Sequence, residues 1–311
     1  MNSIAVDFGG TVIKTALIKD GEIIKRDNLP AYSESGLAPR LKDVEKTIYN
    51  MLYYDDIKKF AGIGIAVTGA VDPKTKKIMS LYGKNEDLEN IDLSNWCQNT
   101  FGLPMVMEMD SKLALLGEMH YGVGVGYQDV VILTFGTGIG TAVAIDGKIL
   151  SGRKNVAGLL SSHLIINVDG RKCTCPNYGC LEASACGWAI DELAREFPGF
   201  KGSGLNTEET VNFKILEKWY KKMDPVACHI MEYCVKQWRA GILNMIHAYV
   251  PELVILSGGI MKFEGLFEML TDSLQDSIWD CCGTIKYALS KNPDDSVLYG
   301  THQLVSENFS K

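Results

Sequence analysis

Short apolar runs bounded by turn residues recur along the first 110 positions and predict one α/β unit. Such runs predict strands at 3–7, 12–18, 22–29, 61–67 and 104–109. Apolar residues recur at helical spacing over 37–54, and residues 90–101 have a helical pattern. The expected order is a three-strand meander, a helix, a strand, a second helix and a fifth strand.

A similar series follows in the rest of the chain. The pattern predicts a helix at 111–121, a strand at 130–135, a hairpin over 141–149, helices from 184 to 250 and a buried strand at 253–256. We expect a loop at 198–206, and a return of the chain over 282–300 before a short last helix. The two halves therefore indicate a weak internal duplication.

This organisation predicts two domains. We place the first, smaller α/β domain at 1–112 together with a C-terminal helix at about 298–311. The second, larger α/β domain covers 113–297. A chain of 311 residues is too long for one small core, which agrees with this division.

Glycine-rich turns follow three of the predicted strands. They comprise Asp7, Gly9, Gly10 and Thr11 with the nearby Lys14; Gly136, Thr137, Gly138 and Gly140; and Ser257, Gly258 and Gly259. Glycine lets the backbone approach a ligand closely, and exposed N–H groups in such turns hold phosphate oxygens. One such turn alone is equally well explained as a β-hairpin, but three of them favour a nucleotide site.

Composition and charge exclude several classes of protein. The net charge of −7 gives no basic surface for nucleic acid, and no apolar run approaches the roughly 20 residues that span a bilayer. The N-terminus has no basic and apolar signal-peptide regions, so we expect a cytoplasmic protein. Its nine cysteines are then expected to be reduced thiols, some of them metal ligands.

Asp110 is the candidate catalytic residue. It follows the strand predicted at 104–109, and groups that bind ligands in α/β proteins lie at such strand ends. A carboxylate there can accept the proton of an attacking hydroxyl as a general base. Taken by itself, Asp110 also fits the N-cap of the helix that starts at Ser111.

A cysteine cluster predicts a structural zinc site. Cys173, Cys175 and Cys180 lie within eight residues, and His163, ten residues before Cys173, is the candidate fourth ligand. Four protein ligands would close the site, which is typical of structural rather than catalytic zinc. The alternative is three unrelated buried thiols.

Together these motifs resemble the ROK family, the repressors, open reading frames and sugar kinases of the actin-like ATPase superfamily. The resemblance runs over almost the whole chain. Its motifs are Asp7–Thr11 with Lys14, Gly69-Ala70-Val71-Asp72, Asp110, Gly136–Gly140, Cys173–Cys180 with Glu182, and Ser257–Gly259. It implies an α/β fold of two actin-like, ribonuclease H-like domains with a cleft between them.

The resemblance also implies a carbohydrate kinase. The expected reaction is ATP-dependent phosphorylation of a sugar or glycoside hydroxyl, with Mg²⁺, structural Zn²⁺ and Asp110 as the base. The glycine turns would bind the nucleotide, and the sugar contacts would be Gly69, Ala70, Met109, Asp110 and Glu182. The expected partners are a small sugar or glycoside and a second copy of the chain, without nucleic acid or membrane.

The chain departs from the family at the expected sugar contacts. Met109 stands where the family has an asparagine, and the family glutamate falls on Leu159 or Leu160 depending on register. The same register puts the family histidine on Ser162 or His163. An apolar residue cannot bond a sugar hydroxyl, so these changes predict an altered substrate.

Two other interpretations of these changes stay open. Neighbours such as Ser161, Ser162 or Lys112 would compensate if an ordinary hexose is the substrate. The losses also fit a sensor of the same fold that binds a sugar or nucleotide without catalysis. Asp7, Thr11 and Asp110 favour the kinase over the sensor, because a sensor has no need of a general base.

Overall fold

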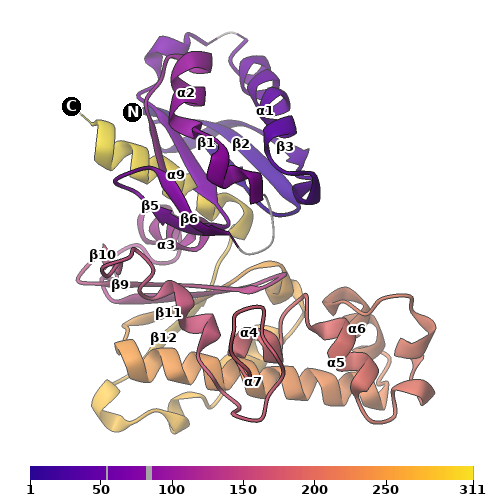
Figure 1. Cartoon of the computed structure of the whole chain (residues 1–311). Helices are drawn as coiled ribbons and strands as arrows, with labels where there is room; N and C mark the ends of the chain where they lie inside the picture. Colours follow the sequence, from indigo (N-terminus) through magenta and orange to yellow (C-terminus); the bar gives the residue numbers. More distant parts are fainter. Residues whose placement is uncertain (54, 82–85, 311) are drawn as a thin grey trace. The chain divides into compact units, whose positions relative to one another are not determined.

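The computed structural model describes residues 1–53, 55–81 and 86–310. It shows an α/β protein with two mixed five-stranded sheets, one in each of two units (Figure 1). Unit 1 comprises 1–126, 149–157 and 291–311, and unit 2 comprises 127–148 and 158–290. The domain boundaries expected from the sequence stay a prediction.

The sheet of unit 1 has the order β3-β2-β1-β4-β7. Its strands are β1 (Asn2–Phe8), β2 (Val12–Lys19), β3 (Glu22–Pro30), β4 (Ile63–Val67) and β7 (Met105–Met109). The first three form an antiparallel meander, and β1, β4 and β7 run parallel. A small hairpin, β5 (Gly69–Asp72) with β6 (Lys77–Leu81), was not predicted.

Helices cover both faces of this sheet, because its strands are apolar on both sides. Ile4, Val6 and Phe8 pack in one core with α1 (Ala38–Met51) and α2 (Leu93–Phe101). The opposite face packs against α3 (Asp110–Tyr121) and α9 (Pro293–Phe309), where the strand residues are small (Figure 1).

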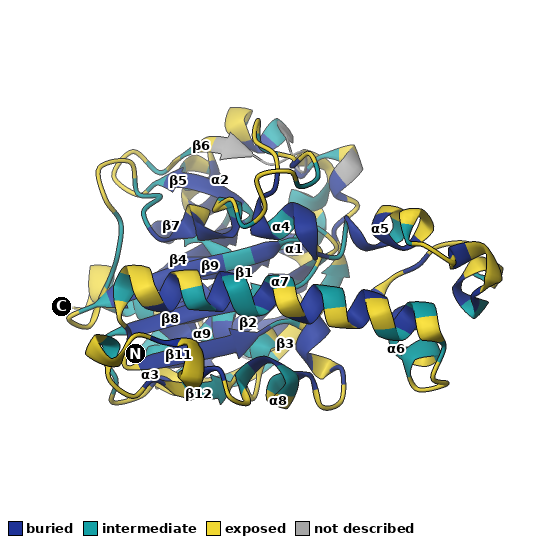
Figure 2. Cartoon of the chain, turned by 90° about the horizontal axis from the view of Figure 1, so that it is seen from below, coloured by how far each residue is buried: buried dark blue, intermediate teal, exposed yellow. Residues whose placement is uncertain are grey.

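The sheet of unit 2 repeats the same topology in the order β10-β9-β8-β11-β12. Its strands are β8 (Val130–Phe135), β9 (Ile139–Ile145), β10 (Lys148–Ile149), β11 (Leu253–Ser257) and β12 (Lys286–Leu289). The helices are α4 (Leu181–Ser184), α5 (Ile190–Glu196), α6 (Phe213–Tyr220), α7 (Pro225–Tyr249) and α8 (Leu266–Thr271). Figure 2 shows the buried stripe that runs along α7. The shared strand order confirms the predicted duplication.

The expectation for the C-terminal end was wrong in two respects. The final helix is long, 17 residues from Pro293, and β12 precedes it where only a connecting segment was expected. Ser296, Gly300 and Thr301 are buried along with Leu298 and Val305, so the apolar pattern that reveals a helix in the sequence is interrupted. The loop at 198–206 contains two short 3₁₀ helices.

Small residues let α3 and α9 approach each other until their backbones touch. A Cβ on Gly117 would lie 1.9 Å from the Ser296 carbonyl oxygen, and one on Gly300 would lie 1.8 Å from the Leu113 carbonyl oxygen. Both distances are far below any van der Waals contact. Only glycine therefore fits at either position without separating the helices.

Gly300→Ala should lower the free energy of unfolding by about 2 kcal/mol or more. Alanine is the better helix former, but its methyl group would displace α3 from α9, and overpacking of this kind costs about 1–3 kcal/mol even against side chains. Urea denaturation measures the change. Gly202→Ala is the control because nothing lies within 4 Å of a Cβ there. A variant as stable as the control would contradict this account of the interface.

Candidate active site

The first glycine turn joins β1 to β2 in unit 1. A Cβ on Gly9 would lie 2.6 Å from the carbonyl oxygen of Val12, so the turn is as tight as a glycine allows. The Ser33 hydroxyl donates a 2.7 Å hydrogen bond to the Gly10 carbonyl oxygen and supports the turn from outside. Thr11 is exposed at its tip.

Acidic side chains gather around Lys14 beside this turn. The Lys14 ammonium lies 3.2 Å from Asp294 Oδ1 and 3.8 Å from Asp7 Oδ2. Burial raises the pKa of Asp7 to about 7; the ammonium of Lys14 opposes the rise, and the charges of Asp110 and Asp294 add to it. Asp294 was missed in the sequence, where its only signal was its place after Pro293 in a helical first turn.

Asp110 begins α3 at the end of β7. Met109 is the N-cap, so the structure does not support the alternative that Asp110 caps the helix. Asp110 Oδ1 instead accepts hydrogen bonds from the Ser111 backbone N–H at 2.6 Å and from the Ser111 hydroxyl at 3.1 Å. Burial raises the pKa of Asp110, although both Ser111 bonds favour its charged form.

Asp7 should make stability depend on pH. Between pH 4 and 7 the folded protein keeps the Asp7 proton, whereas the unfolded chain releases it near pH 4. The folded state binds more protons in this window, so stability falls as the pH rises towards 7.

Asp7→Asn has no carboxyl group to ionise. It should be more stable than the wild type above pH 7, by at most about 4 kcal/mol, and should lose this advantage as the pH falls to about 4. Urea denaturation across this range, without nucleotide or metal, measures the difference. A difference that does not vary with pH would contradict the prediction.

The other expected sugar contacts of unit 1 lie near Asp110. Gly69 and Ala70 are buried in β5, which packs against β7. Met109, the last residue of β7, is half-buried next to Asp110. The structure thus brings three of the predicted residues in this unit close to the candidate base.

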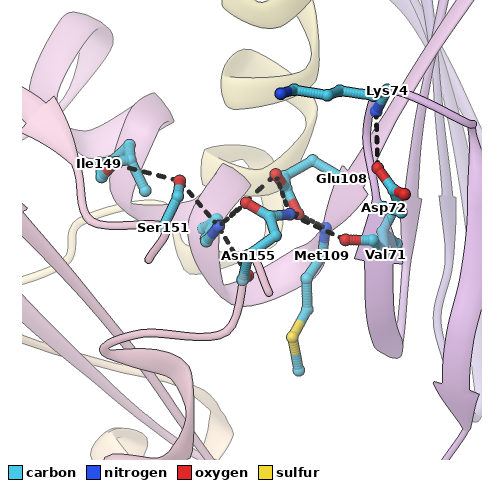
Figure 3. A network of polar contacts seen from close by, with 9 residues as sticks. Val71, Asp72, Lys74, Glu108, Met109, Ile149, Ser151 and Asn155 are labelled. Carbon is cyan, nitrogen blue, oxygen red and sulfur yellow. Dashed lines mark hydrogen bonds and ion pairs between the residues drawn. The ribbon is translucent and has the colours of Figure 1, made fainter. Parts of the chain in front are cut away.

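A buried lysine, Lys112, ties three segments of unit 1 together, and Figure 3 shows its partners Glu108 and Asn155. Lys112 Nζ donates to the Asn155 carbonyl oxygen at 2.9 Å and to its Oδ1 at 2.5 Å, and lies 3.7 Å from Glu108 Oε2. Asn155 Nδ2 donates in turn to Glu108 and to the Val71 carbonyl oxygen. Glu108 Oε1 also accepts the Met109 backbone N–H, next to Asp110.

This network was not predicted, because its members are far apart in the sequence. Asn155 has a φ of 58°, which asparagine tolerates better than most residues, but no local pattern marks its long-range bonds. Burial lowers the pKa of Lys112, and Glu108 opposes this change.

Lys112→Met should lower the free energy of unfolding by about 3 kcal/mol, because Glu108 would keep a negative charge in a largely buried place without its cation. Urea denaturation tests this. Lys42→Met on α1 is the matched control, since Lys42 is exposed, and should change stability by less than about 0.5 kcal/mol. Equal effects of the two substitutions would show that the Lys112 network does not stabilise the fold.

In unit 2 the structure brings the second and third glycine turns together. Gly136–Gly140 follows β8 and Ser257–Gly259 follows the neighbouring parallel strand β11. Gly258 has a φ of 100°, and a Cβ there would lie 2.3 Å from the Phe135 carbonyl oxygen. The third turn therefore lies against the end of β8, directly before the second turn.

The predicted metal ligands also come together in unit 2. The ligand atoms of His163, Cys173, Cys175 and Cys180 all lie within 4.8 Å of one another. Cys173 Sγ is 3.5 Å from His163 Nδ1, and the Sγ atoms of Cys175 and Cys180 are also 3.5 Å apart. Such spacing and ligand types fit a tetrahedral zinc ion. His163, not Ser162, lies beside the cysteines.

Comparison with known proteins identifies the family. Residues 3–308 match the ROK family. The chain belongs to the ROK family. It is 30% identical to a glucokinase from Thermotoga maritima, over 98% of this chain and 97% of the relative. It is also 28% identical to a xylose repressor from Caldicellulosiruptor bescii, over 80% of this chain and 63% of the repressor.

The fold matches that of ROK kinases. The structure of a ROK family glucokinase from Streptomyces griseus in complex with glucose and AMPPNP superposes with a TM-score of 0.82 at 23% identity. The match covers 99% of this chain and 100% of that one. In the described part of this ROK protein, no helix has both the length and the apolar character needed to cross a membrane.

Proposed function

We propose that this ROK protein phosphorylates a hydroxyl of a sugar or glycoside with ATP. The observation that carries the proposal is the place of Asp110 directly after β7, because β7 runs parallel to β4 and β1 in one sheet and β1 leads into the first glycine turn at the same edge. A base is thus held near a candidate phosphate site within one unit. The similarity to a glucokinase supports the same reaction class.

Asp110, the three glycine turns and Asp7 have separate roles in this reaction. Asp110 accepts the proton of the attacking hydroxyl, and its raised pKa suits a group that must take up and release a proton. Backbone N–H groups of the turns at Gly9–Thr11, Gly136–Gly140 and Ser257–Gly259 orient the nucleotide. Asp7 would hold Mg²⁺ through water, and the ion would neutralise charge on the transferred phosphate.

The substrate is proposed to differ from plain glucose. The family glutamate lies three residues before the metal-binding histidine. With His163 as that histidine, the glutamate position is occupied by the exposed Leu160. Met109 replaces the family asparagine next to Asp110. A site that lacks two polar contacts favours a sugar without the matching hydroxyl groups or a glycoside with an apolar aglycone.

The second candidate function is a sensor that binds its ligand without catalysis. The same two apolar residues, Met109 and Leu160, favour it. The similarity to a xylose repressor shows that curated relatives of this chain are not all kinases. One assay of ATP turnover distinguishes the two candidates, because they predict different results in it.

A coupled assay with ATP and Mg²⁺ over monosaccharides, amino sugars and β-glucosides separates the candidates. We expect turnover with one class, and a fall in kcat of about 10²–10⁴-fold in Asp110→Asn with nucleotide affinity retained. Strong turnover of glucose or N-acetylmannosamine would contradict the altered substrate. Intact nucleotide binding without turnover of any compound would favour the sensor.

Assembly and location also remain proposals. We propose a homodimer in the cytoplasm, on the basis of the family resemblance.

A further inference from the structure

Glu182 connects the metal cluster of unit 2 to its second glycine turn. Glu182 Oε2 accepts the backbone N–H of Ile139, within the turn, at 3.1 Å. Glu182 Oε1 accepts hydrogen bonds from the indole of Trp188 at 3.3 Å and from the hydroxyl of Thr174 at 3.4 Å. Both carboxylate oxygens are thus engaged within unit 2, which fixes the orientation of the side chain.

The same segment also holds the turn through its backbone. Gly187 N–H donates to the Gly136 carbonyl oxygen at 3.0 Å, and Trp188 N–H donates to the Thr137 carbonyl oxygen at 2.9 Å. A Cβ on Gly187 would lie 2.7 Å from the Gly136 oxygen, and one on Gly138 would lie 3.0 Å from Glu182 Oε2. The position of residues 182–188 therefore determines the position of the turn.

The metal ligands determine where that segment begins. Cys180 is the N-cap of α4, the short helix that carries Glu182. Thr174, the hydroxyl donor to Glu182, lies between the ligands Cys173 and Cys175. An ion bound by the cluster would hold both the carboxylate and one of its donors in place.

We propose that Glu182 is a positioning residue that couples zinc binding to the phosphate-binding turn, so that zinc raises nucleotide affinity even without sugar. This rests on the proposed function, because it takes Gly136–Gly140 as a nucleotide site. It adds to the sugar contact that the family resemblance implies for Glu182. A carboxylate held at both oxygens orders the turn before the nucleotide arrives, which reduces the entropy lost on binding.

The experiment measures the affinity of AMPPNP with Mg²⁺ by calorimetry, without sugar, before and after zinc is removed by a chelator and restored. We expect zinc-loaded wild-type protein to bind about 10-fold more tightly than zinc-depleted protein, the size of effect that charged hydrogen bonds supply. Glu182→Gln should bind about 10-fold more weakly than wild type when loaded, and its affinity should not respond to zinc. Glutamine has only one acceptor oxygen, whereas the Glu182 carboxylate accepts from Ile139 with one oxygen and from Trp188 and Thr174 with the other.

Two further variants keep the test valid if the zinc-depleted protein unfolds. Thr174→Val leaves all four ligands in place but removes one donor, and should weaken binding about 3-fold. Thr174→Ser keeps a hydroxyl and should restore wild-type affinity. Glu264→Gln is the matched control, because Glu264 is a largely exposed carboxylate of unit 2 and its change should leave affinity unaltered.

The outcomes separate this inference from the proposed function. Nucleotide affinity that is the same with and without zinc in folded wild type, or wild-type affinity in Glu182→Gln, would overturn the coupling alone. Glu182→Gln with weakened sugar affinity and unchanged nucleotide affinity would assign Glu182 to the sugar only. A zinc-loaded wild type that binds no nucleotide would overturn both.

Discussion

The close contact between α3 and α9 is the constraint on which unit 1 depends. Gly117 and Gly300 let the two backbones touch, and this brings a helix from the far end of the chain onto the sheet formed by its first 110 residues. The contact has consequences for chemistry as well as stability. It places Asp294 beside Lys14 and a buried Ser296 hydroxyl against Glu118 of α3. The charge around the first glycine turn thus depends on how closely two helices pack.

Much of the fold could be predicted because its strands follow simple rules. Runs such as 61–67 and 130–135 are almost entirely apolar and are followed by glycine turns, so the local sequence alone indicates buried strands. The final helix was expected to be shorter than it is, because small and polar residues separate the apolar Leu298 and Val305 on its buried face. It packs closely on Gly117 of α3 and on Gly64 of β4, and no local pattern reveals either contact.

In the candidate site, too, the sequence predicted some features and not others. Cysteine spacing predicted the cluster, and residue type pointed to His163, because metal ligands must have the right chemistry wherever they lie. Asp110 was predicted from its place after a strand, and β7 does end directly before it, while its catalytic role stays a prediction. The Lys112–Asn155 contact and the approach of Asp294 to Lys14 join residues 43 and 280 positions apart. Such polar contacts arise only after folding has brought the segments together, and sequence patterns within one element cannot show them.

The division of the chain into units has a consequence for its synthesis. Unit 2 is complete once residue 290 has been made, whereas unit 1 still lacks 291–311 and therefore all of α9. Until residues 291–311 have been made, α9 cannot cover its face of the unit 1 sheet. During translation, unit 2 can therefore fold first although unit 1 emerges first from the ribosome, and in that interval unit 1 has all five strands of its sheet but not the helix α9.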